Sequence, residues 1–309
     1  MRLLFYSPEP DGEWPAALER AAAERGLRAE LRPWPEAEPC DYALVWRPPA
    51  ALFAAQPGLK AAFALGAGVD SLLANPGLPP GLPIYRIEDA GMAAQMAEYA
   101  LYVCLEKLRG FDGYRAAQAA GRWAPGPYRS RAGFKAAVLG LGALGSAVAR
   151  ALSDFGFTVG GWSRRPKELP GVHCHAGPEG LLHCLADAEL VVALLPLSDE
   201  TRGLLGEREL SALPQGAWLV NLARGPVVRE EALLKALDEG RIGRAYLDVF
   251  SEEPPPADSP WWAHPRVAMT PHIAALTPPA ASAAQIMDKI AALEAGLPAS
   301  GLVDRGSGY

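Results

Sequence analysis

The sequence predicts an α/β protein with two domains, each built around a parallel sheet. Short apolar runs alternate with segments of helical periodicity along the chain, an order typical of parallel strands connected by helices. The alternation is interrupted once, by a long helical stretch and a loop rich in glycine, proline and aromatic residues. A chain of 309 residues is long enough for two ordinary domains.

The first strand–helix series begins with an apolar strand at Arg2–Ser7. A helical stretch at 14–26 follows and ends at a glycine, which is typical of a helix C-terminus. The interrupting helix spans 90–110 and leads into the loop GRWAPGPYRSRAG. Between the two helices, three more apolar strands are expected, within 41–49, 59–70 and 82–87.

The second series begins at Phe134. It contains six apolar strands, FKAAVLG, FTVGGW, ELVVALL, GAWLVNL, RAYLDVF and RVAMT. An alanine-rich helix follows the first of them. A last helix is expected within 278–296, and its pattern alone does not assign it to either sheet.

Composition and charge exclude several classes of protein. A net charge of −6 and a pI near 5.5 argue against a general binder of nucleic acids or anionic membranes, because both need a basic surface. No apolar stretch approaches the roughly 18 residues of a membrane span, and the first residues lack the pattern of a signal peptide. The four cysteines do not have disulfide-framework spacing. We therefore expect a cytoplasmic protein with no nucleic-acid or membrane partner.

One short segment resembles a metal site at first sight, because histidines and cysteines gather in it: His173, Cys174, His175, His183 and Cys184. Adjacent side chains in His-Cys-His do not easily converge on one ion, and neither CxxC nor HExxH spacing is present. No metal is predicted.

A glycine-rich turn follows the first strand of the second series. Gly140, Gly142 and Gly145 have GxGxxG spacing between an apolar strand and a helix, which is the context that dinucleotide binding requires. The first glycine permits the tight turn, the second lets a pyrophosphate approach the backbone, and the third lets helix and strand pack closely. The helix N-terminus offers unpaired amides to the phosphates.

The end of the next strand indicates which dinucleotide binds. An enzyme that prefers NAD normally has a carboxylate there to hold the ribose hydroxyls. This chain has Ser163, Arg164, Arg165 and Lys167, which can hold a 2′-phosphate through charge-assisted hydrogen bonds. We therefore predict NADP as cofactor, with NADPH preferred and NAD as the alternative. The other interpretation is an ordinary solvated basic turn.

Three polar residues follow three later strands: Arg224, Glu253 and His272. In an open parallel sheet, ligands bind at the carboxyl ends of the strands. Reduction of a 2-keto acid needs a proton at the carbonyl oxygen, and histidine suits that task because its pKa lies near working pH. Glu253 would orient the ring and favour the imidazolium, and Arg224 would bind the substrate carboxylate and polarise the carbonyl. Separately, each residue also has a purely structural interpretation.

These segments together resemble the D-2-hydroxyacid dehydrogenase family. GLGALG, NLARGPVV, LDVFSEEP and TPHIAA are similar to its motifs, and LGAGVDSLL, WSRRPK and the terminal GLVDRGSGY are similar to its glyoxylate/hydroxypyruvate reductase branch. The resemblance implies a flavodoxin-like substrate domain of residues 1–90 and 277–309. A Rossmann domain of residues 91–276, including the interdomain helix, would be inserted in it. The resemblance also implies a homodimer, with the loop around Trp123 as part of the contact.

The resemblance further implies substrate and cofactor contacts. Backbone amides of Ala67, Gly68 and Val69 would hold the substrate carboxylate beside Trp46, although an ordinary glycine turn and a core tryptophan would have the same sequence. His272 and Arg224 complete the substrate set. The predicted cofactor site also includes Ala143, Leu144, Leu195, Pro196, Leu222, Ala223 and Asp248.

The function expected from these residues is NADPH-dependent reduction of glyoxylate to glycolate and of hydroxypyruvate to D-glycerate, with His272 as general acid. Glu253 argues against a formate dehydrogenase, which has glutamine as the histidine's partner. Four alternatives stay open: a reductase for a bulkier 2-keto acid, an enzyme that oxidises phosphite, a dinucleotide-sensing protein similar to a corepressor, and a nucleotide-binding protein without chemistry. A nucleotide-binding protein without chemistry would be indifferent to the loss of His272.

Overall fold

The computed structural model of the protein describes residues 1–8, 12–35, 38–306 and 308. The chain divides into two compact units, Met1–Met92 with Thr277–Tyr309, and Ala93–Leu276. The assignment of the first unit to the substrate and of the second to a dinucleotide stays a prediction. Ser307 and Tyr309, in the terminal segment GLVDRGSGY, lie outside the described residues.

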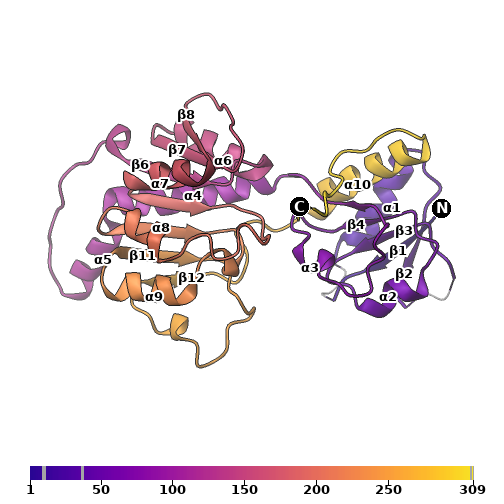
Figure 1. The fold of residues 1–309 in the computed structure, drawn as a ribbon, viewed down its shortest axis with the longest axis horizontal. Coiled ribbons are helices and arrows are strands. Elements are labelled where there is room, and N and C mark those ends of the chain that lie inside the picture. The colour runs from indigo at the N-terminus through magenta and orange to yellow at the C-terminus, as the bar shows by residue number, and fades with distance from the viewer. Residues whose placement is uncertain (9–11, 36–37, 307, 309) are drawn as a thin grey trace. The chain divides into compact units, whose positions relative to one another are not determined.

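The first unit contains a five-stranded parallel sheet (Figure 1). Its strand order, β2-β1-β3-β4-β5, is the flavodoxin-like order, so this part of the predicted fold is confirmed. The strands are β1 (Arg2–Tyr6), β2 (Glu30–Pro33), β3 (Tyr42–Val45), β4 (Ala61–Ala64) and β5 (Ile84–Tyr85). The helices are α1 (Trp14–Glu24), α2 (Ala50–Ala55), α3 (Asp70–Leu73) and α10 (Pro279–Glu294).

Every residue of β3 and β4 is buried, which shows that both faces of this sheet are covered. Helices α2 and α3 pack on one face through Phe53 and Leu72. Helix α10 lies beside α1 although the two come from opposite ends of the sequence (Figure 1). A hydrogen-bonded ion pair joins them, with 2.6 Å between Arg25 Nε and Asp288 Oδ1.

The second unit contains a seven-stranded parallel sheet of order β12-β11-β10-β9-β6-β7-β8, the doubly wound Rossmann arrangement that the sequence predicts. The strands are β6 (Lys135–Leu139), β7 (Thr158–Ser163), β8 (Val172–Ala176), β9 (Leu190–Ala193), β10 (Ala217–Asn221), β11 (Ile242–Leu247) and β12 (Val267–Met269). The helices are α4 (Met92–Arg109), α5 (Phe111–Ala119), α6 (Ala143–Asp154), α7 (Gly177–Ala186), α8 (Glu207–Ala212) and α9 (Glu230–Asp238).

Alternate residues of the central strands face two separate cores. Ala137 and Leu139 of β6 pack with α7, α8 and α9, whereas Ala136 and Val138 pack with α4 and α6. This two-residue period is what a strand buried on both faces requires. In the part of the chain that the structure describes, no helix has the length and apolarity needed to cross a membrane.

The order of the seven strands reverses between β6 and β9, which lie side by side. In a doubly wound sheet, ligands bind outside the carboxyl ends of the strands at such a reversal. The carboxyl edge of the seven-stranded sheet is therefore where a functional site is expected.

Candidate active site

Most of the predicted site residues follow successive strands at the carboxyl edge of the seven-stranded sheet. Because all the paired strands are parallel, their carboxyl ends share this edge. The predicted residues that end or follow a strand there are Gly140, Ser163, Leu195, Pro196, Leu222, Ala223, Arg224, Asp248, Glu253 and His272.

The glycine turn between β6 and α6 has the shape that a pyrophosphate needs. Gly140 has a φ of +100°, and a Cβ there would lie 2.6 Å from the carbonyl oxygen of Leu194. A Cβ on Gly145 would lie 1.7 Å from the oxygen of Gly140, so only glycine lets helix and strand approach so closely. A Cβ on Gly142 would meet nothing within 4 Å, and this open, exposed backbone begins α6.

The two residues after Gly142 start the helix. Ala143 is exposed and Leu144 is half-buried, at the N-terminal end of α6. Their position places them beside the open backbone rather than in the core. The backbone conformation of the described residues around the turn therefore leaves room for a dinucleotide.

The basic turn after β7 is organised by hydrogen bonds. The buried Ser163 hydroxyl donates to the carbonyl oxygen of Arg165 at 2.7 Å. Arg164 forms an ion pair with Glu200, and Lys167 donates to the carbonyl oxygen of Leu141 inside the glycine turn. The lysine therefore ties the basic turn to the glycine turn. All three cationic side chains are exposed, as contacts to a 2′-phosphate would require.

Arg224 is presented by a turn that Asn221 shapes. Asn221, at the end of β10, is 1% exposed; its Nδ2 donates to the oxygen of Arg224 and its Oδ1 accepts from the amide of Ala223. Gly225 follows, and a Cβ there would lie 2.0 Å from the carbonyl carbon of Phe250. The backbone after Arg224 therefore passes directly against the turn after β11. Arg224 itself is half-buried and donates to the oxygen of Ala223 at 2.7 Å.

His272 and Glu253 form a hydrogen-bonded pair. His272 Nδ1 lies 2.8 Å from Glu253 Oε2, and Glu253 Oε1 accepts from the amide of Phe250 at 3.1 Å. Both side chains are partly exposed, at 36% for His272 and 23% for Glu253. Because an ionised carboxylate only accepts, it fixes a proton on Nδ1 and leaves Nε2 for exchange with another molecule.

Asp248 holds the loop that carries the histidine. Its carboxylate is 1% exposed and accepts from Thr270 Oγ1 at 2.6 Å and from the amides of Ile273 and Ala274 at 2.9 Å each. Its carbonyl oxygen accepts from the amide of His272 at 2.9 Å. The side chain thus has structural partners already, and its predicted contact with a cofactor stays a prediction.

The predicted substrate residues of the first unit gather at the carboxyl edge of its own sheet. Trp46 directly follows β3, and its half-buried ring lies over Gly66, where a Cβ would be 2.9 Å from Trp46 Cζ3. Ala67, Gly68 and Val69 follow Gly66 in the loop after β4. No hydrogen bond between described residues uses the amides of these three residues. They are therefore available to an anion, and their contact with the substrate carboxylate stays a prediction.

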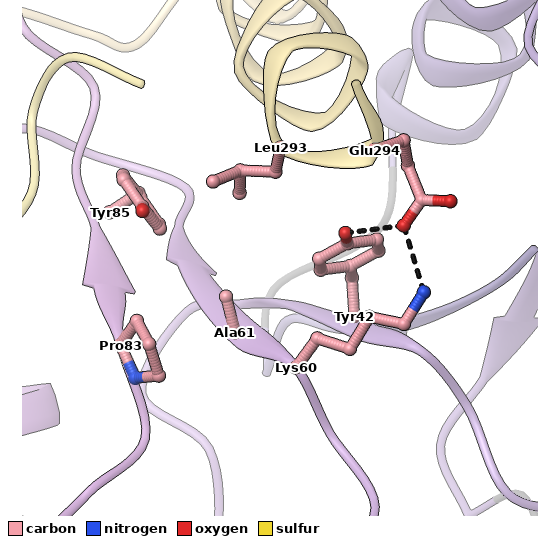
Figure 2. Close-up of a pocket in the computed structure, with 7 residues that line it drawn as sticks. All are labelled: Tyr42, Lys60, Ala61, Pro83, Tyr85, Leu293 and Glu294. Atoms are coloured by element: carbon pink, nitrogen blue, oxygen red, sulfur yellow. Dashed lines mark hydrogen bonds and ion pairs between the residues drawn. The ribbon is translucent and has the colours of Figure 1, made fainter. Parts of the chain in front are cut away.

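A cavity of about 430 Å³ lies at the opposite edge of the same sheet (Figure 2). Tyr42 and Ala61 begin β3 and β4, and Glu294 ends α10 above them. Glu294 Oε1 accepts from Tyr42 Oη at 2.7 Å and from Lys60 Nζ at 2.8 Å, as the dashed lines of Figure 2 show. These bonds, the lysine's first, hold the pKa of Glu294 below its usual value. The cavity is at the amino ends of the strands and contains none of the predicted site residues.

The histidine–cysteine segment lies in β8 and α7. Cys174 in β8 packs towards the core of α4 and α6, whereas Cys184 in α7 packs in the core of the opposite face. Burial, followed by the charges of His183 and His173, lowers the pKa of His175. Among the described residues, no group of three or more histidine, cysteine or acidic side chains could hold a metal ion.

Two residues that shape this site, Asn221 and Thr270, are not among the residues predicted from the sequence. Both had a detectable signal. Asn221 is a polar residue inside the apolar run GAWLVNL, and Thr270 ends the run RVAMT immediately before a proline. A polar side chain that is withdrawn from solvent needs hydrogen-bond partners. Asn221 bonds to the turn of Arg224, and Thr270 bonds to Asp248 and to Tyr99 of α4.

Comparison with known proteins gives consistent matches. Residues 101–274 match the family model described as D-isomer specific 2-hydroxyacid dehydrogenase, NAD binding domain. The chain is 45% identical over 317 aligned residues to glyoxylate/hydroxypyruvate reductase A of Serratia proteamaculans, with 100% of both chains covered.

Two solved structures are also similar. A D-isomer specific 2-hydroxyacid dehydrogenase from Xanthobacter autotrophicus Py2, in complex with NADPH and MES, is 44% identical with a TM-score of 0.94. An NADPH-dependent glyoxylate/hydroxypyruvate reductase from Sinorhizobium meliloti, in complex with NADP and sulfate, is 32% identical with a TM-score of 0.91. Each match covers 100% of this chain and 99% of the solved one.

Proposed function

The chain belongs to the D-isomer specific 2-hydroxyacid dehydrogenase family, and from that premise we propose that it reduces small 2-keto acids with NADPH. The substrates are glyoxylate, which gives glycolate, and hydroxypyruvate, which gives D-glycerate. The observation that carries this proposal is the hydrogen bond between His272 and Glu253, beside the turn of Arg224 on the edge that also bears the glycine turn. The name of the Serratia relative and the titles of the two solved structures support it.

The backbone around Gly142 fits the pyrophosphate of the cofactor, since the space above it is open and α6 begins there. Leu195, Pro196, Leu222 and Ala223 would line the same edge, and Arg164, Arg165 and Lys167 would hold the 2′-phosphate with Ser163. When bound, NADPH supplies a hydride to the carbonyl carbon of the substrate. The protein's own residues must then bind the substrate and supply the proton.

His272 supplies the proton through Nε2. Its Nδ1 faces Glu253, so the carboxylate orients the ring and stabilises the imidazolium before transfer. Arg224 binds the substrate carboxylate and stabilises the negative charge that grows on the carbonyl oxygen. In the first unit, the amides of Ala67, Gly68 and Val69, beside Trp46, support the predicted contact with the substrate carboxylate.

The experiment is a steady-state panel of glyoxylate, hydroxypyruvate and bulkier 2-keto acids with NADPH and with NADH, and of phosphite with NADP and NAD. We expect turnover of the two small acids and a higher kcat/KM with NADPH than with NADH. Activity with phosphite alone, or no turnover at all, would contradict the proposal.

We also propose a homodimer in the cytoplasm. Only Ala117 is buried in α5, and every residue from 118 to 130 is exposed. This segment carries Trp123, which is 98% exposed, and Tyr128, which is 90% exposed. Aromatic side chains are enriched in protein interfaces, and a second copy of the chain would cover them. None of the four cysteines, all of them described, forms a disulfide, which suits a reducing compartment.

Light scattering of the purified protein tests the oligomeric state. We expect about twice the chain mass of 32.7 kDa. The substitution Trp123→Glu should shift the protein towards the monomer, because it places a charge in the contact. A wild-type protein that is monomeric at all concentrations would contradict the dimer.

A further inference from the structure

A chain of hydroxyl groups connects α4 to the histidine loop. Tyr99 of α4 has its hydroxyl 2.8 Å from Thr270 Oγ1, and Thr270 Oγ1 lies 2.6 Å from Asp248 Oδ1. The donor in each of these hydrogen bonds follows from the protons that each group carries. An ionised carboxylate only accepts, so Thr270 donates its single proton to Asp248, and Tyr99 must donate to Thr270.

The loop at the end of this chain is strained. His272 has a φ of +55°, in the left-handed region that side chains other than glycine rarely adopt. Such a conformation persists only where the surroundings over-determine it. Here the bonds from Thr270, Ile273 and Ala274 to the Asp248 carboxylate hold the residues on both sides of the histidine.

Tyr99 is well placed to stabilise this arrangement. Helix α4 is anchored in the core through Ala97 and Ala100, and Ala274 is buried in the same core. Burial, as the first cause, raises the pKa of Tyr99, so its hydroxyl stays protonated and keeps donating over the working range of pH.

We propose that Tyr99 is a positioning residue for proton transfer by His272, acting through Thr270 and Asp248. This inference rests on the proposed function, because it assigns Tyr99 a role in the same reaction. Tyr99 does not touch the histidine. Its hydroxyl orients the Thr270 hydroxyl, which fixes one oxygen of the carboxylate that holds the loop.

The test compares Tyr99→Phe with Tyr102→Phe. Tyr102 is on the same helix, but it is 56% exposed and its hydroxyl bonds to Glu106 instead. The loss of one hydrogen bond should lower kcat about three- to tenfold in Tyr99→Phe, with KM for NADPH unchanged. Tyr102→Phe should keep the wild-type kcat. Equal kcat values for wild type and Tyr99→Phe would overturn the proposal, as would a loss that appears in KM for NADPH.

Two substitutions of Thr270 distinguish positioning from general packing. Thr270→Val removes the hydroxyl and should lower kcat at least as much as Tyr99→Phe, whereas Thr270→Ser keeps the hydroxyl and should restore most of it. Because the two hydroxyls act in one chain, Tyr99→Phe combined with Thr270→Val should be no slower than Thr270→Val alone. A double variant in which the two losses multiply would contradict a shared chain.

A measurement independent of activity separates this inference from the proposed function. Hydrogen exchange of the Ile273 and Ala274 amides, which Asp248 accepts, should be faster in Tyr99→Phe and unchanged in Tyr102→Phe. Wild-type protein that reduces no 2-keto acid would defeat the proposed function, while faster exchange would still show that Tyr99 holds the loop. If the wild type is active but Tyr99→Phe changes neither the exchange nor kcat, the proposed function stands and only the inference about Tyr99 fails.

Discussion

His272 Nδ1 lies 2.8 Å from Glu253 Oε2, and the two residues are 19 positions apart on loops that follow different strands. The carboxylate also accepts the amide of Phe250 through its other oxygen, so its orientation is fixed from both sides. Because each oxygen of Glu253 has a defined partner, the effect of a substitution at Glu253 on kcat can be predicted.

Glu253→Gln should lower kcat about 10- to 100-fold while KM for NADPH stays near the wild-type value. The amide keeps an oxygen for Phe250 but turns an NH2 group towards His272, so the imidazolium loses its acceptor. Steady-state kinetics with glyoxylate measures the effect, and the loss is part of the range expected for acid–base groups. Glu252→Gln, at the exposed neighbouring position, is the control and should change neither constant.

Arg224→Lys should raise KM for the 2-keto acid and lower kcat. Lysine keeps the charge but loses the two-pronged geometry with a carboxylate. Fluorescence titration should give an unchanged Kd for NADPH. The exposed Arg229, which bonds to Gly203, provides the matched control as Arg229→Lys. An unchanged KM for the keto acid in Arg224→Lys would show that the guanidinium does not bind the substrate.

Two glycine substitutions should separate folding from cofactor binding. A Cβ at position 142 meets no atom within 4 Å, so Gly142→Ala should keep the wild-type Tm and lose affinity for NADPH. A Cβ at position 145 would collide with the oxygen of Gly140, so Gly145→Ala should lower both the Tm and the affinity for NADPH. Thermal unfolding with and without NADPH measures the two effects. Full NADPH affinity in Gly142→Ala would argue against a pyrophosphate at this backbone.

Arg165→Gln should lower kcat/KM for NADPH and leave kcat/KM for NADH nearly unchanged. Arg164 and Lys167 have protein partners, whereas the structure shows no partner for the Arg165 guanidinium among the described residues. Only NADPH carries the 2′-phosphate that this guanidinium would bind. Equal losses with both cofactors would place Arg165 away from the phosphate.

Stability should depend on pH through Lys107. Burial lowers the pKa of Lys107 to about 8, and its Nζ donates to the oxygen of Gly216 at 2.8 Å. The folded pKa lies below the unfolded one, so between about pH 8 and about pH 10 the unfolded chain binds more protons, and the free energy of unfolding rises with pH. Wild type should therefore gain stability over Lys107→Met across this window in urea titrations. The exposed Lys135, replaced as Lys135→Met, is the control; a Lys107→Met difference that does not change with pH would contradict the lowered pKa.

The sequence predicts every strand of both sheets except β2 and β8, each of which lies at one edge of its sheet. Central strands are buried on both faces and appear as continuous apolar runs, as in β9 and β10. The edge strands β2 and β8 contain no buried residue, so no apolar run marks them. β8 contains His173, Cys174 and His175, three of the five residues that resemble a metal site; a strand with no buried residue can have polar side chains on both of its faces.

The catalytic residues that the sequence predicts are those that come within a short loop of the end of a strand. Arg224, Glu253 and His272 stand out because each follows an apolar run at the end where ligands bind. The residues that hold these three in place do not stand out in the sequence. Tyr99 and Thr270, for example, are 171 residues apart, and only the fold brings them together. The local sequence also does not predict the left-handed backbone at His272, because this conformation depends on hydrogen bonds to the distant carboxylate of Asp248.

The most direct test of the proton-donor role is kcat for glyoxylate reduction by His272→Asn, followed as NADPH absorbance. Asparagine tolerates the left-handed backbone at this position, so the loop should keep its shape. We expect kcat to fall by about 10²- to 10⁴-fold with an unchanged Kd for NADPH. A variant that turns over at close to the wild-type rate would show that His272 does not donate the proton.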